Sequence, residues 1–375
     1  MFFITNFIFL LFVSTSFGAI RRSFRYKWPK TGIRVNYYYN SWYLDKAIAN
    51  LEENTCLRFK REYDYYGIKD DNGLEFIWTE YCYVDHVGKK INNESNKIYV
   101  SKECMYDVTK IEALMLQALG LLTEYSRRDR NNYIKINKDN INPKYERYFY
   151  LNGISNASTY KTPYDYGSIL HDDSKAFSKN NQDTLEVKNE HKEFYQKMIG
   201  QRYRTGFYDY KLINEHYCSD ECKDKGKKPE CWWNGYQNPN KCNECLCPYP
   251  LTGSICRGIL PNSSPSINNY YKIDERGRRF NLYDQIDVHI FLETDHPKKL
   301  RFTWEKMNLY NYTPCGPKSD AAEVKYKADK GLTGLCFCGY INEPYSIDSE
   351  DKLLIFIYHG SYLFNHITFF VKPIS

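Results

Sequence analysis

The uneven distribution of cysteines constrains this chain more than any other feature of its sequence. The chain has 375 residues and 13 cysteines. Most of them crowd into one short segment, at Cys218, Cys222, Cys231, Cys242, Cys245, Cys247 and Cys256. A segment of this size cannot bury enough apolar surface to fold without cross-links. The cysteines therefore divide the chain into a long first region, a small middle region at 219–257, and a third region at 265–375.

The N-terminus indicates the compartment in which these cysteines act. An apolar run extends from Phe7 to Val13, and Ser16 and Gly18 suit the last positions before a signal-peptide cleavage site. We predict a signal peptide at 1–18, a mature chain that begins at Ala19, and a secreted, extracellular protein. The alternative is a membrane anchor, but this run is short for a bilayer and no other run is long enough.

Secretion explains the cysteine content and a second set of signals. Cysteines pair in an oxidising compartment. The pattern Asn-x-Ser/Thr predicts N-linked glycans at Asn93, Asn156, Asn262 and Asn311. The 52 basic and 46 acidic residues leave a formal charge of +6, which is too mild to favour nucleic acid as a partner.

The middle and third regions have different patterns. The middle region is too small to fold without either disulfides or a bound metal, and a zinc knuckle is the alternative to disulfides there. The third region contains short β-rich runs, among them "DVHIFL" and "KLRFTWEKMNL", separated by turns. This pattern predicts a β-sandwich at 265–375.

The first region contains a series of segments that resemble a known family. They are "KWPKTGIRVNYYY", "AIANLEENTCLRFK", "YDYGSILHDDSKAFS" and "IGQRYRTGFYDYKLINEHYC". In this order they are similar to the astacin family of zinc metalloendopeptidases, and we assign 19–218 to such a domain. The resemblance implies an α+β, metzincin-like fold of two lobes, with a mixed twisted sheet and long helices. In the middle region "CLCPYPLTGSIC" resembles the end of an EGF-like module, and the third region resembles the second half of a CUB domain.

These resemblances also imply how the cysteines pair. The implied disulfides are Cys56–Cys218, Cys82–Cys104, Cys222–Cys242, Cys231–Cys245, Cys247–Cys256 and Cys315–Cys338. Spacing alone leaves several pairings open in the middle region. Cys336 is then the odd cysteine, either free or bonded to another chain.

The residues that carry chemistry in the family are absent from the corresponding helix here. In the family this helix carries His-Glu-x-x-His, and a glycine turn then brings a third His before a Glu. Two histidines four residues apart lie on one helix face and can share a zinc ion. Aligned on Gly120 and Glu124 in "ALMLQALGLLTEYSRRDR", the three ligand positions hold Ala113, Gln117 and Thr123, and Leu114 holds the general-base position.

A second family motif, Ser-x-Met-His-Tyr, has changed as well. It reads here from Ser168 to Asp172, with Leu170 at the methionine position and Asp172 at the tyrosine position. His171 remains, as a structural histidine or as one ligand of a different ion. Because Ala and Leu have no donor atom, and neutral Gln and Thr are poor zinc ligands, we predict no cofactor and no catalytic residue.

Three residues receive structural roles from the resemblance. Gly120 forms the turn after the helix. Glu124 holds the family position that receives a new N-terminal ammonium, which here would be that of Ala19. Gln117, Thr123 and Asp172 are expected to form a hydrogen-bonded cluster with Leu114 packed beside it, in place of the metal.

Three functions remain open at this point. The first is a pseudoprotease that binds an extracellular protein or matrix ligand, such as an extended peptide along the strand at Asn96–Ser101, which the resemblance makes the edge of the sheet. The alternative for that strand is an ordinary edge strand without a ligand. The second function is a zinc-dependent metalloendopeptidase that cleaves extracellular proteins. The third is a decoy for inhibitors or substrates of active astacins.

Overall fold

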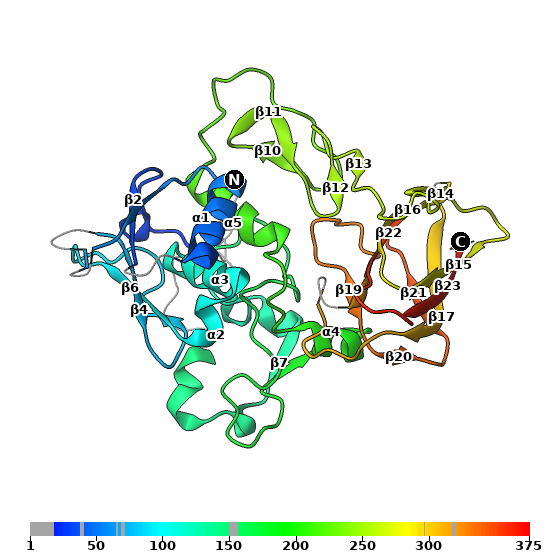
Figure 1. Cartoon of the computed structure of the whole chain (residues 1–375), viewed down its shortest axis with the longest axis horizontal. Coiled ribbons are helices and arrows are strands. Elements are labelled where there is room, and N and C mark those ends of the chain that lie inside the picture. The colour runs from blue at the N-terminus through cyan, green and yellow to red at the C-terminus, as the bar shows by residue number, and fades with distance from the viewer. Residues whose placement is uncertain are drawn as a thin grey trace, which may run out of the picture.

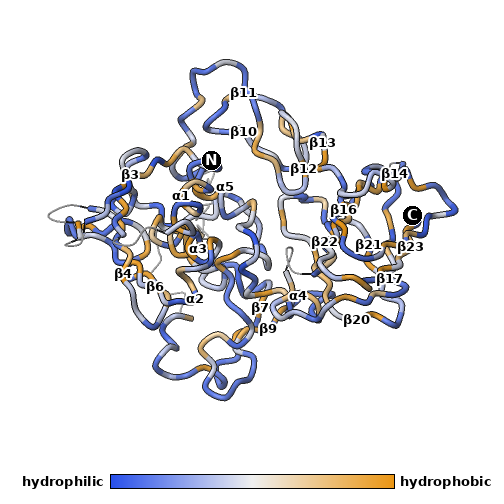
Figure 2. Tube along the Cα trace, viewed as in Figure 1, coloured by the Kyte–Doolittle hydropathy of each residue, from blue (hydrophilic) through white to orange (hydrophobic). Residues whose placement is uncertain are grey.

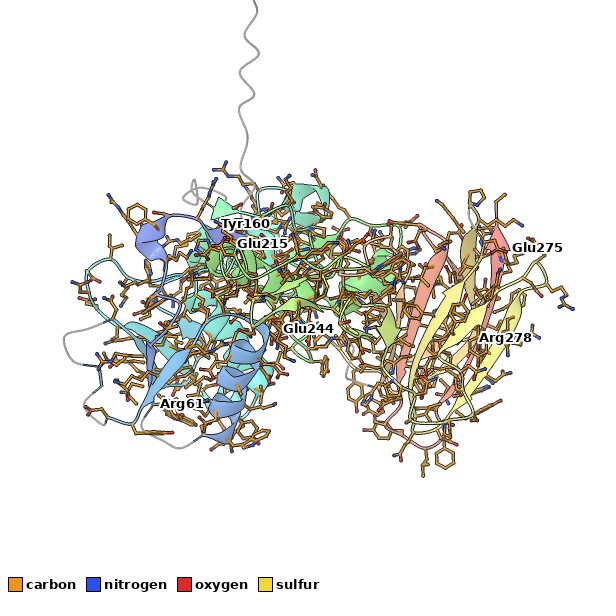
Figure 3. The ribbon with its side chains drawn as sticks, turned by 90° about the horizontal axis from the view of Figure 1, so that it is seen from above. Arg61, Tyr160, Glu215, Glu244, Glu275 and Arg278 are labelled. Carbon is orange, nitrogen blue, oxygen red and sulfur yellow. A yellow bond between two sulfur atoms is a disulfide. The ribbon has the colours of Figure 1, made fainter. Side chains whose placement is uncertain are left out.

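Three structural parts follow one another along the chain. The computed structural model describes residues 19–37, 41–64, 67–68, 72–149, 157–295, 297–316 and 320–375. An α+β part occupies one end, a small module of short strands follows, and a β-sandwich occupies the other end (Figure 1). Seen from above, Arg61 in the first part and Arg278 in the sandwich lie at opposite ends of the molecule (Figure 3). The helices of the described ranges are all too short or too polar to cross a membrane.

A mixed five-stranded sheet forms the first lobe of the α+β part. The strand order is β3-β2-β4-β6-β5. The strands are β2 (Ile33–Asn36), β3 (Phe59–Glu62), β4 (Leu74–Trp78), β5 (Tyr83–Val84) and β6 (Asn96–Val100). All neighbours are parallel except β5 and β6, which are antiparallel.

The prediction that Asn96–Ser101 forms the edge of this sheet is wrong. Strand β6 lies between β4 and β5, because Ile98 pairs with Phe76 on one side and with Val84 on the other. The edge strand is β5. A strand of two residues is too short to produce an alternating hydrophobic pattern, so no separate sequence signal marks it.

Helices with one apolar face cover this sheet. They are α1 (Trp42–Asn54), α2 (Lys102–Met105) and α3 (Val108–Ala118). The Ser41 hydroxyl caps α1 by accepting a hydrogen bond from the Leu44 N–H at 3.3 Å. The helices and the sheet bury one common core, which includes Leu44, Ile48, Leu51, Ile98, Val100, Ile111 and Met115.

The second lobe consists of short elements joined by turns. Its strands are β1 (Ile20–Arg21), β7 (Ile134–Ile136), β8 (Ala157–Ser158) and β9 (Leu185–Val187), and its α-helices are α4 (Lys192–Met198) and α5 (Phe207–Tyr217). The 3-10 helices are η1 (Phe24–Tyr26), η2 (Glu124–Ser126), η3 (Arg130–Asn132), η4 (Lys138–Asn140) and η5 (Pro143–Phe149). Strand β1 pairs with β8, and Ile20 also forms a bridge with Leu121, so the start of the described chain lies against the segment that follows α3.

The EGF-like module consists of four short strands. They are β10 (Tyr236–Asn238), β11 (Lys241–Leu246), β12 (Leu251–Thr252) and β13 (Gly258–Ile259), which pair as two antiparallel hairpins. The last strand lies just beyond the predicted module boundary at 257.

Two facing sheets form the CUB-like sandwich. One has the order β14-β16-β22-β18-β19, and the other has β15-β23-β17-β20 with β21 beside β17. The strands are β14 (Tyr270–Lys272), β15 (Arg278–Tyr283), β16 (Asp287–Glu293), β17 (Lys299–Asn308), β18 (Ala321–Lys325), β19 (Leu335–Phe337), β20 (Tyr340–Ile341), β21 (Tyr345–Asp348), β22 (Leu353–His359) and β23 (His366–Ile374). Hydrophobic residues follow these strands, whereas the connecting loops are more polar (Figure 2).

Six disulfides lie within the described residues of the three parts. They are Cys56–Cys218, Cys82–Cys104, Cys222–Cys242, Cys231–Cys245, Cys247–Cys256 and Cys315–Cys338, the same pairs that the resemblances imply. Cys336 carries a free thiol and is 1% exposed within the sandwich. Its burial leaves no route for a bond to a second chain in this conformation.

The sandwich packs directly against the second lobe of the α+β part. One continuous hydrophobic core contains Tyr166 and Met198 from the lobe together with Trp304 and Phe337 from the sandwich. Polar contacts cross the same interface. The Asp165 carboxylate accepts hydrogen bonds from the Thr333 hydroxyl at 3.0 Å and the Thr333 N–H at 3.2 Å. The two parts therefore share a core and have no solvated linker between them.

We predict that Thr333→Val destabilises the whole chain. The substitution keeps the side-chain shape but removes the hydroxyl donor to buried Asp165, at a cost of about 1–2 kcal/mol. Chemical denaturation monitored by hydrogen exchange should show this loss in both the second lobe and the sandwich. The matched control is Thr303→Val, because the Thr303 hydroxyl bonds Ser346 at 2.9 Å within the sandwich, away from the interface with the second lobe. A loss confined to the sandwich would contradict the shared core.

Candidate functional site

Helix α3 and the turn after it place the residues that correspond to the family's metal site. The Asp107 carboxylate caps the helix start by accepting hydrogen bonds from the Thr109 and Lys110 N–H groups at 2.9 and 3.0 Å. At the other end, the Trp28 indole N–H donates to the Ala118 carbonyl at 2.8 Å. Gly120 has a φ of 112°, a conformation that L side chains rarely adopt. The chain therefore turns sharply after α3, as the sequence predicted.

The positions on α3 that align with the family's metal site carry almost no side-chain atoms that could bind a metal ion. Ala113 is 8% exposed and Leu114 is 7% exposed, and both belong to the core of the first lobe. Leu170, at the methionine position of the second motif, is 2% exposed in the same core. Gln117 and Thr123 are half-buried. Apolar packing therefore takes up the space of two of the motif's four functional residues.

His171 is a structural histidine in this arrangement. It is fully buried, and both ring nitrogens have partners: Nε2 lies 2.7 Å from the Tyr164 hydroxyl and Nδ1 lies 2.8 Å from the Asp172 carbonyl. The carbonyl can only accept, so Nδ1 carries the proton and Nε2 accepts from Tyr164. Burial lowers the pKa of His171 to about 4. The ring is therefore neutral and has no free lone pair for a metal.

The predicted polar cluster forms only in part. The hydroxyl of buried Tyr125 lies close to the side chains of both Thr123 and Asp172. Thr123 also bonds Ser126 at 2.6 Å between hydroxyl oxygens. For Gln117 the contacts are through its backbone, whose carbonyl accepts from Gly88 and Gly120. The prediction omitted Tyr125, because that residue lies one position past Glu124 and has no part in the family motif.

Arg202 is a further residue that the sequence analysis missed. Its guanidinium donates to the His171 carbonyl at 2.8 Å and pairs with the Asp172 carboxylate at 3.2 Å. Burial raises the pKa of Asp172, and the nearby Arg202 charge opposes that rise. A guanidinium thus balances the acidic residue at the position where the family has tyrosine. No local sequence signal links two positions 30 residues apart.

These residues do not fit a zinc ion. Zinc sites in proteins use three or four imidazole, thiolate or carboxylate donors. Ala113 and Leu114 have no donor atom, and both nitrogens of His171 are engaged. Across the described part of the chain, no group of three or more His, Cys, Asp and Glu side chains is placed to hold a metal ion.

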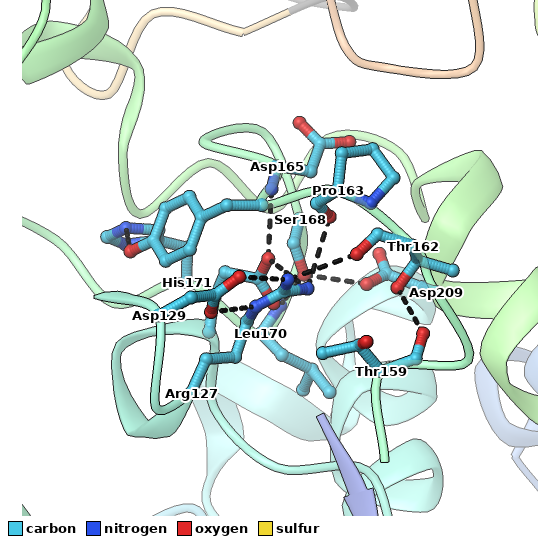
Figure 4. Close-up of polar contacts among 12 residues, drawn as sticks. Arg127, Asp129, Thr159, Thr162, Pro163, Asp165, Ser168, Leu170, His171 and Asp209 are labelled. Atoms are coloured by element: carbon cyan, nitrogen blue, oxygen red, sulfur yellow. Dashed lines mark hydrogen bonds and ion pairs between the residues drawn. The ribbon is translucent and has the colours of Figure 1, made fainter. Parts of the chain in front are cut away.

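A buried charge network lies beside this site (Figure 4). Arg127 pairs with Glu124 at 3.3 Å and with both oxygens of Asp129 at 2.9 and 2.8 Å. The Glu124 carboxylate also accepts from the Asp165 N–H at 2.9 Å. Arg127 therefore forms structural ion pairs. Arg130 differs, because it donates to two backbone carbonyls and forms no ion pair among the contacts of the described residues.

Carboxylates crowd around Glu124. Burial raises the pKa of Glu124 to about 8, although the Arg127 charge opposes the rise, and the nearby Asp209 and Asp165 charges add to it. Burial also raises the pKa of Asp209 to about 6, although that side chain accepts a hydrogen bond from Ser168 at 2.6 Å. Near neutral pH, Glu124 therefore holds its proton more readily than a solvated glutamate.

Ala19 and Glu124 have other partners than the sequence analysis expected. Ala19 is 1% exposed, as expected, but its N–H donates to the Ser158 carbonyl at 3.0 Å and its carbonyl accepts from Leu122 at 2.8 Å. Glu124 faces Arg127 instead. Residue 19 is bonded to residue 18 here, so its nitrogen is a neutral amide. A direct bond between a freed Ala19 ammonium and Glu124 stays a prediction.

The predicted glycosylation sites differ in their surroundings. Asn93 and Asn311 are exposed. Asn262 is half-buried, and its amide donates to the Ile267 carbonyl at 2.8 Å and accepts from the His289 N–H at 2.6 Å. Asn156 lies outside the described residues.

We predict that Glu124→Gln makes the chain more stable than its parent as pH rises from about 5 to 8. A raised carboxyl pKa means that the folded state binds a proton that the unfolded state has released, so the parent loses stability across this range. Near pH 5 the two proteins should be similar. Melting temperatures measured against pH test this. The control is Glu103→Gln on exposed residue 103, which should show no such trend, and a parallel pH profile for Glu124→Gln and its parent would contradict the prediction.

Comparisons with known proteins agree with this architecture. The family model for Astacin, described as a peptidase family, matches residues 21–218. The zinc metalloproteinase nas-36 of Brugia malayi is 31% identical over 84% of this chain and 53% of its own length, and the zinc metalloproteinase dpy-31 of the same organism is 29% identical over 84% and 52%. The chain spans about half the length of these relatives.

A solved structure with partial similarity is high choriolytic enzyme 1, a hatching enzyme zinc-protease from Oryzias latipes. It is 24% identical with a TM-score of 0.41, over 52% of this chain and 92% of that one. The assignment itself depends on the family model, which covers more than half of the chain, from the strand β1 to the last cysteine of the α+β part. This protein therefore belongs to the astacin family of peptidases.

Proposed function

We propose that this protein is a secreted astacin-family pseudoprotease that binds an extracellular protein or matrix partner without cleaving it. The observation that carries the proposal is the set of residues at the four functional positions: Ala113, Leu114, Gln117 and Thr123. Zinc-dependent hydrolysis needs a metal-bound water of near-neutral pKa and a base that removes its proton. The first residue offers no ligand and the second offers no base.

Strand β5, at the edge of the first-lobe sheet, has backbone groups that could bind a partner. In the antiparallel pair of β5 and β6, Tyr83 is opposite Tyr99 and the Asp85 N–H donates to the Lys97 carbonyl at 3.1 Å. The N–H and C=O of the intervening Val84 then point away from β6, because hydrogen-bonded and non-hydrogen-bonded pairs alternate. An extended peptide can add to such an edge through backbone hydrogen bonds.

Two other functions have specific support. The relatives are named zinc metalloproteinases, which supports a metalloendopeptidase that acts on extracellular proteins. A decoy that binds inhibitors or substrates of active astacins is supported by the retained fold and edge strand. Metal and cleavage measurements separate the first of these from a pseudoprotease, and binding to inhibitors of active astacins separates the second.

We predict that the purified, secreted chain contains no stoichiometric zinc after dialysis and cleaves no member of a peptide library. Elemental analysis and mass spectrometry of the library measure the two outcomes. A content of about one zinc per chain, or cleavage that a chelator abolishes, would contradict the proposal.

The matched variant carries Ala113→His, Leu114→Glu, Gln117→His and Thr123→His together. It restores the ligands and the base on the same helix and turn, so it should gain zinc. Its activity should remain low, because Leu170 and Asp172 still differ from the family motif. Failure of this variant to bind zinc, while its fold is retained, would show that the alignment of the motif is wrong.

We predict that Val84→Pro abolishes binding of extended peptides selected from a displayed library. Proline removes the outward N–H but is tolerated where a strand edge makes no hydrogen bond to its neighbour. Val84→Thr keeps both the N–H and the β-branched shape, so it should bind as the parent does. Fluorescence anisotropy with one selected peptide provides the measurement. Equal affinity of the proline variant would rule out addition of a strand at this edge.

A further inference from the structure

Aromatic side chains gather on two loops at one end of the CUB-like sandwich. The ring centroids of Tyr310 and Tyr312 are 4.5 Å apart, and those of Tyr310 and Tyr362 are 5.5 Å apart. The hydroxyls of Tyr312 and Tyr362 lie 2.9 Å from each other. Leu363 and Phe364 continue the surface and are 61% and 86% exposed. We call these five residues the tyrosine platform.

A buried carboxylate fixes the loops that carry the platform. Asp320 is 1% exposed. One of its oxygens accepts from the Tyr310 N–H at 3.0 Å. The other accepts from the Ser361 N–H at 2.8 Å and the Asn365 amide at 2.6 Å. The platform is therefore held in place before any ligand arrives, which reduces the entropy lost on binding.

The backbone of Phe364, in the second loop of the platform, is strained. Phe364 has a φ of 76°, in the left-handed region that a bulky residue rarely adopts. The Asp284 carboxylate holds this conformation by accepting from the Phe364 N–H at 3.1 Å. Strain of this kind persists where the surrounding structure enforces it, and it concentrates at functional sites.

The chemistry of the platform is aromatic and uncharged. The two segments that form it, 308–313 and 360–365, contain no Asp, Glu, Lys, Arg or His, in a chain that is 26% charged. Their polar groups are the amides of Asn308, Asn311 and Asn365, of which the last is buried against Asp320, and the hydroxyls of Tyr, Ser and Thr. An anionic lipid surface or a sulfated chain would need basic residues, which these segments lack. The aromatic rings and amides of these segments suit a neutral sugar. The apolar C–H face of a sugar packs on an aromatic ring, and its hydroxyls form hydrogen bonds with amides.

We infer that the tyrosine platform is a docking site for the neutral sugar residues of an extracellular glycan. This inference deepens the proposed binding function and depends only on its extracellular location. It does not depend on the fate of the metal site. One sugar ring stacks on Tyr310 or Tyr362.

The test uses the purified full chain on immobilised neutral oligosaccharides, with a heparin fragment and phosphatidylcholine vesicles as the other probes. We expect binding to at least one neutral oligosaccharide. Tyr310→Ser and Tyr362→Ser should each weaken it about tenfold, because each removes one stacking surface. Both side chains are exposed, so melting temperatures should not change.

The matched control is Tyr270→Ser. Tyr270 is 51% exposed in the same domain, but its hydroxyl bonds Glu293 at 3.0 Å on a charged surface. It should bind sugars as the parent does. Three results would overturn the inference: no neutral oligosaccharide binds the folded chain, the control loses as much affinity as the platform variants, or binding is confined to heparin or vesicles. Because the sequence predicts an N-linked glycan on Asn311, the chain is tested after enzymatic removal of N-linked glycans. Loss of peptide binding in the Val84→Pro variant would not affect the inference about the tyrosine platform.

Discussion

The buried Asp165 carboxylate is the contact on which the arrangement of the whole molecule depends. One oxygen accepts from the Gly167 N–H and the other accepts from the Thr333 N–H and hydroxyl. The backbone N–H of the same residue donates to Glu124. A single residue thus connects the turn near the second motif, the segment after α3, and the sandwich. Since an unpaired buried carboxylate is costly, these donors are obligatory partners. None of these contacts involves a metal ion.

Internal contacts occupy the site where the family's motif holds a metal ion. In a zinc enzyme the metal holds a helix, a turn and a second loop together. Here apolar packing of Leu114 and Leu170 joins the helix to the loop, and Arg202 pairs with Asp172. His171, which keeps its place in the motif, bonds a tyrosine and a carbonyl. These contacts can stabilise the folded chain. They leave no open coordination position, which a catalytic zinc requires.

The sequence predicted the parts of this structure that depend on local or family patterns. The three parts, the turn at Gly120 and the six disulfides belong to this class. The prediction from sequence failed for features that depend on residues brought together only in the folded chain. The two-residue strand β5 has no periodicity, so the edge was assigned to β6. Arg202 reaches Asp172 only because the second lobe folds back. The close packing of the sandwich on that lobe also had no sequence signal, because residues such as Phe337 and Thr333 form an interface that exists only in the folded chain.

The rigid connection between the parts has a consequence for the proposed binding function. The edge strand β5 belongs to the first part, and the tyrosine platform belongs to the sandwich, which lies at the other end of the molecule (Figure 1). A flexible linker would let the two surfaces find a partner at many separations. The shared core that contains Tyr166 and Trp304 fixes their separation instead. Two weak contacts then reinforce each other only on a partner with matching spacing, and geometry becomes a source of selectivity. The proposed binding function therefore predicts that the protein selects an extended matrix assembly over its isolated components.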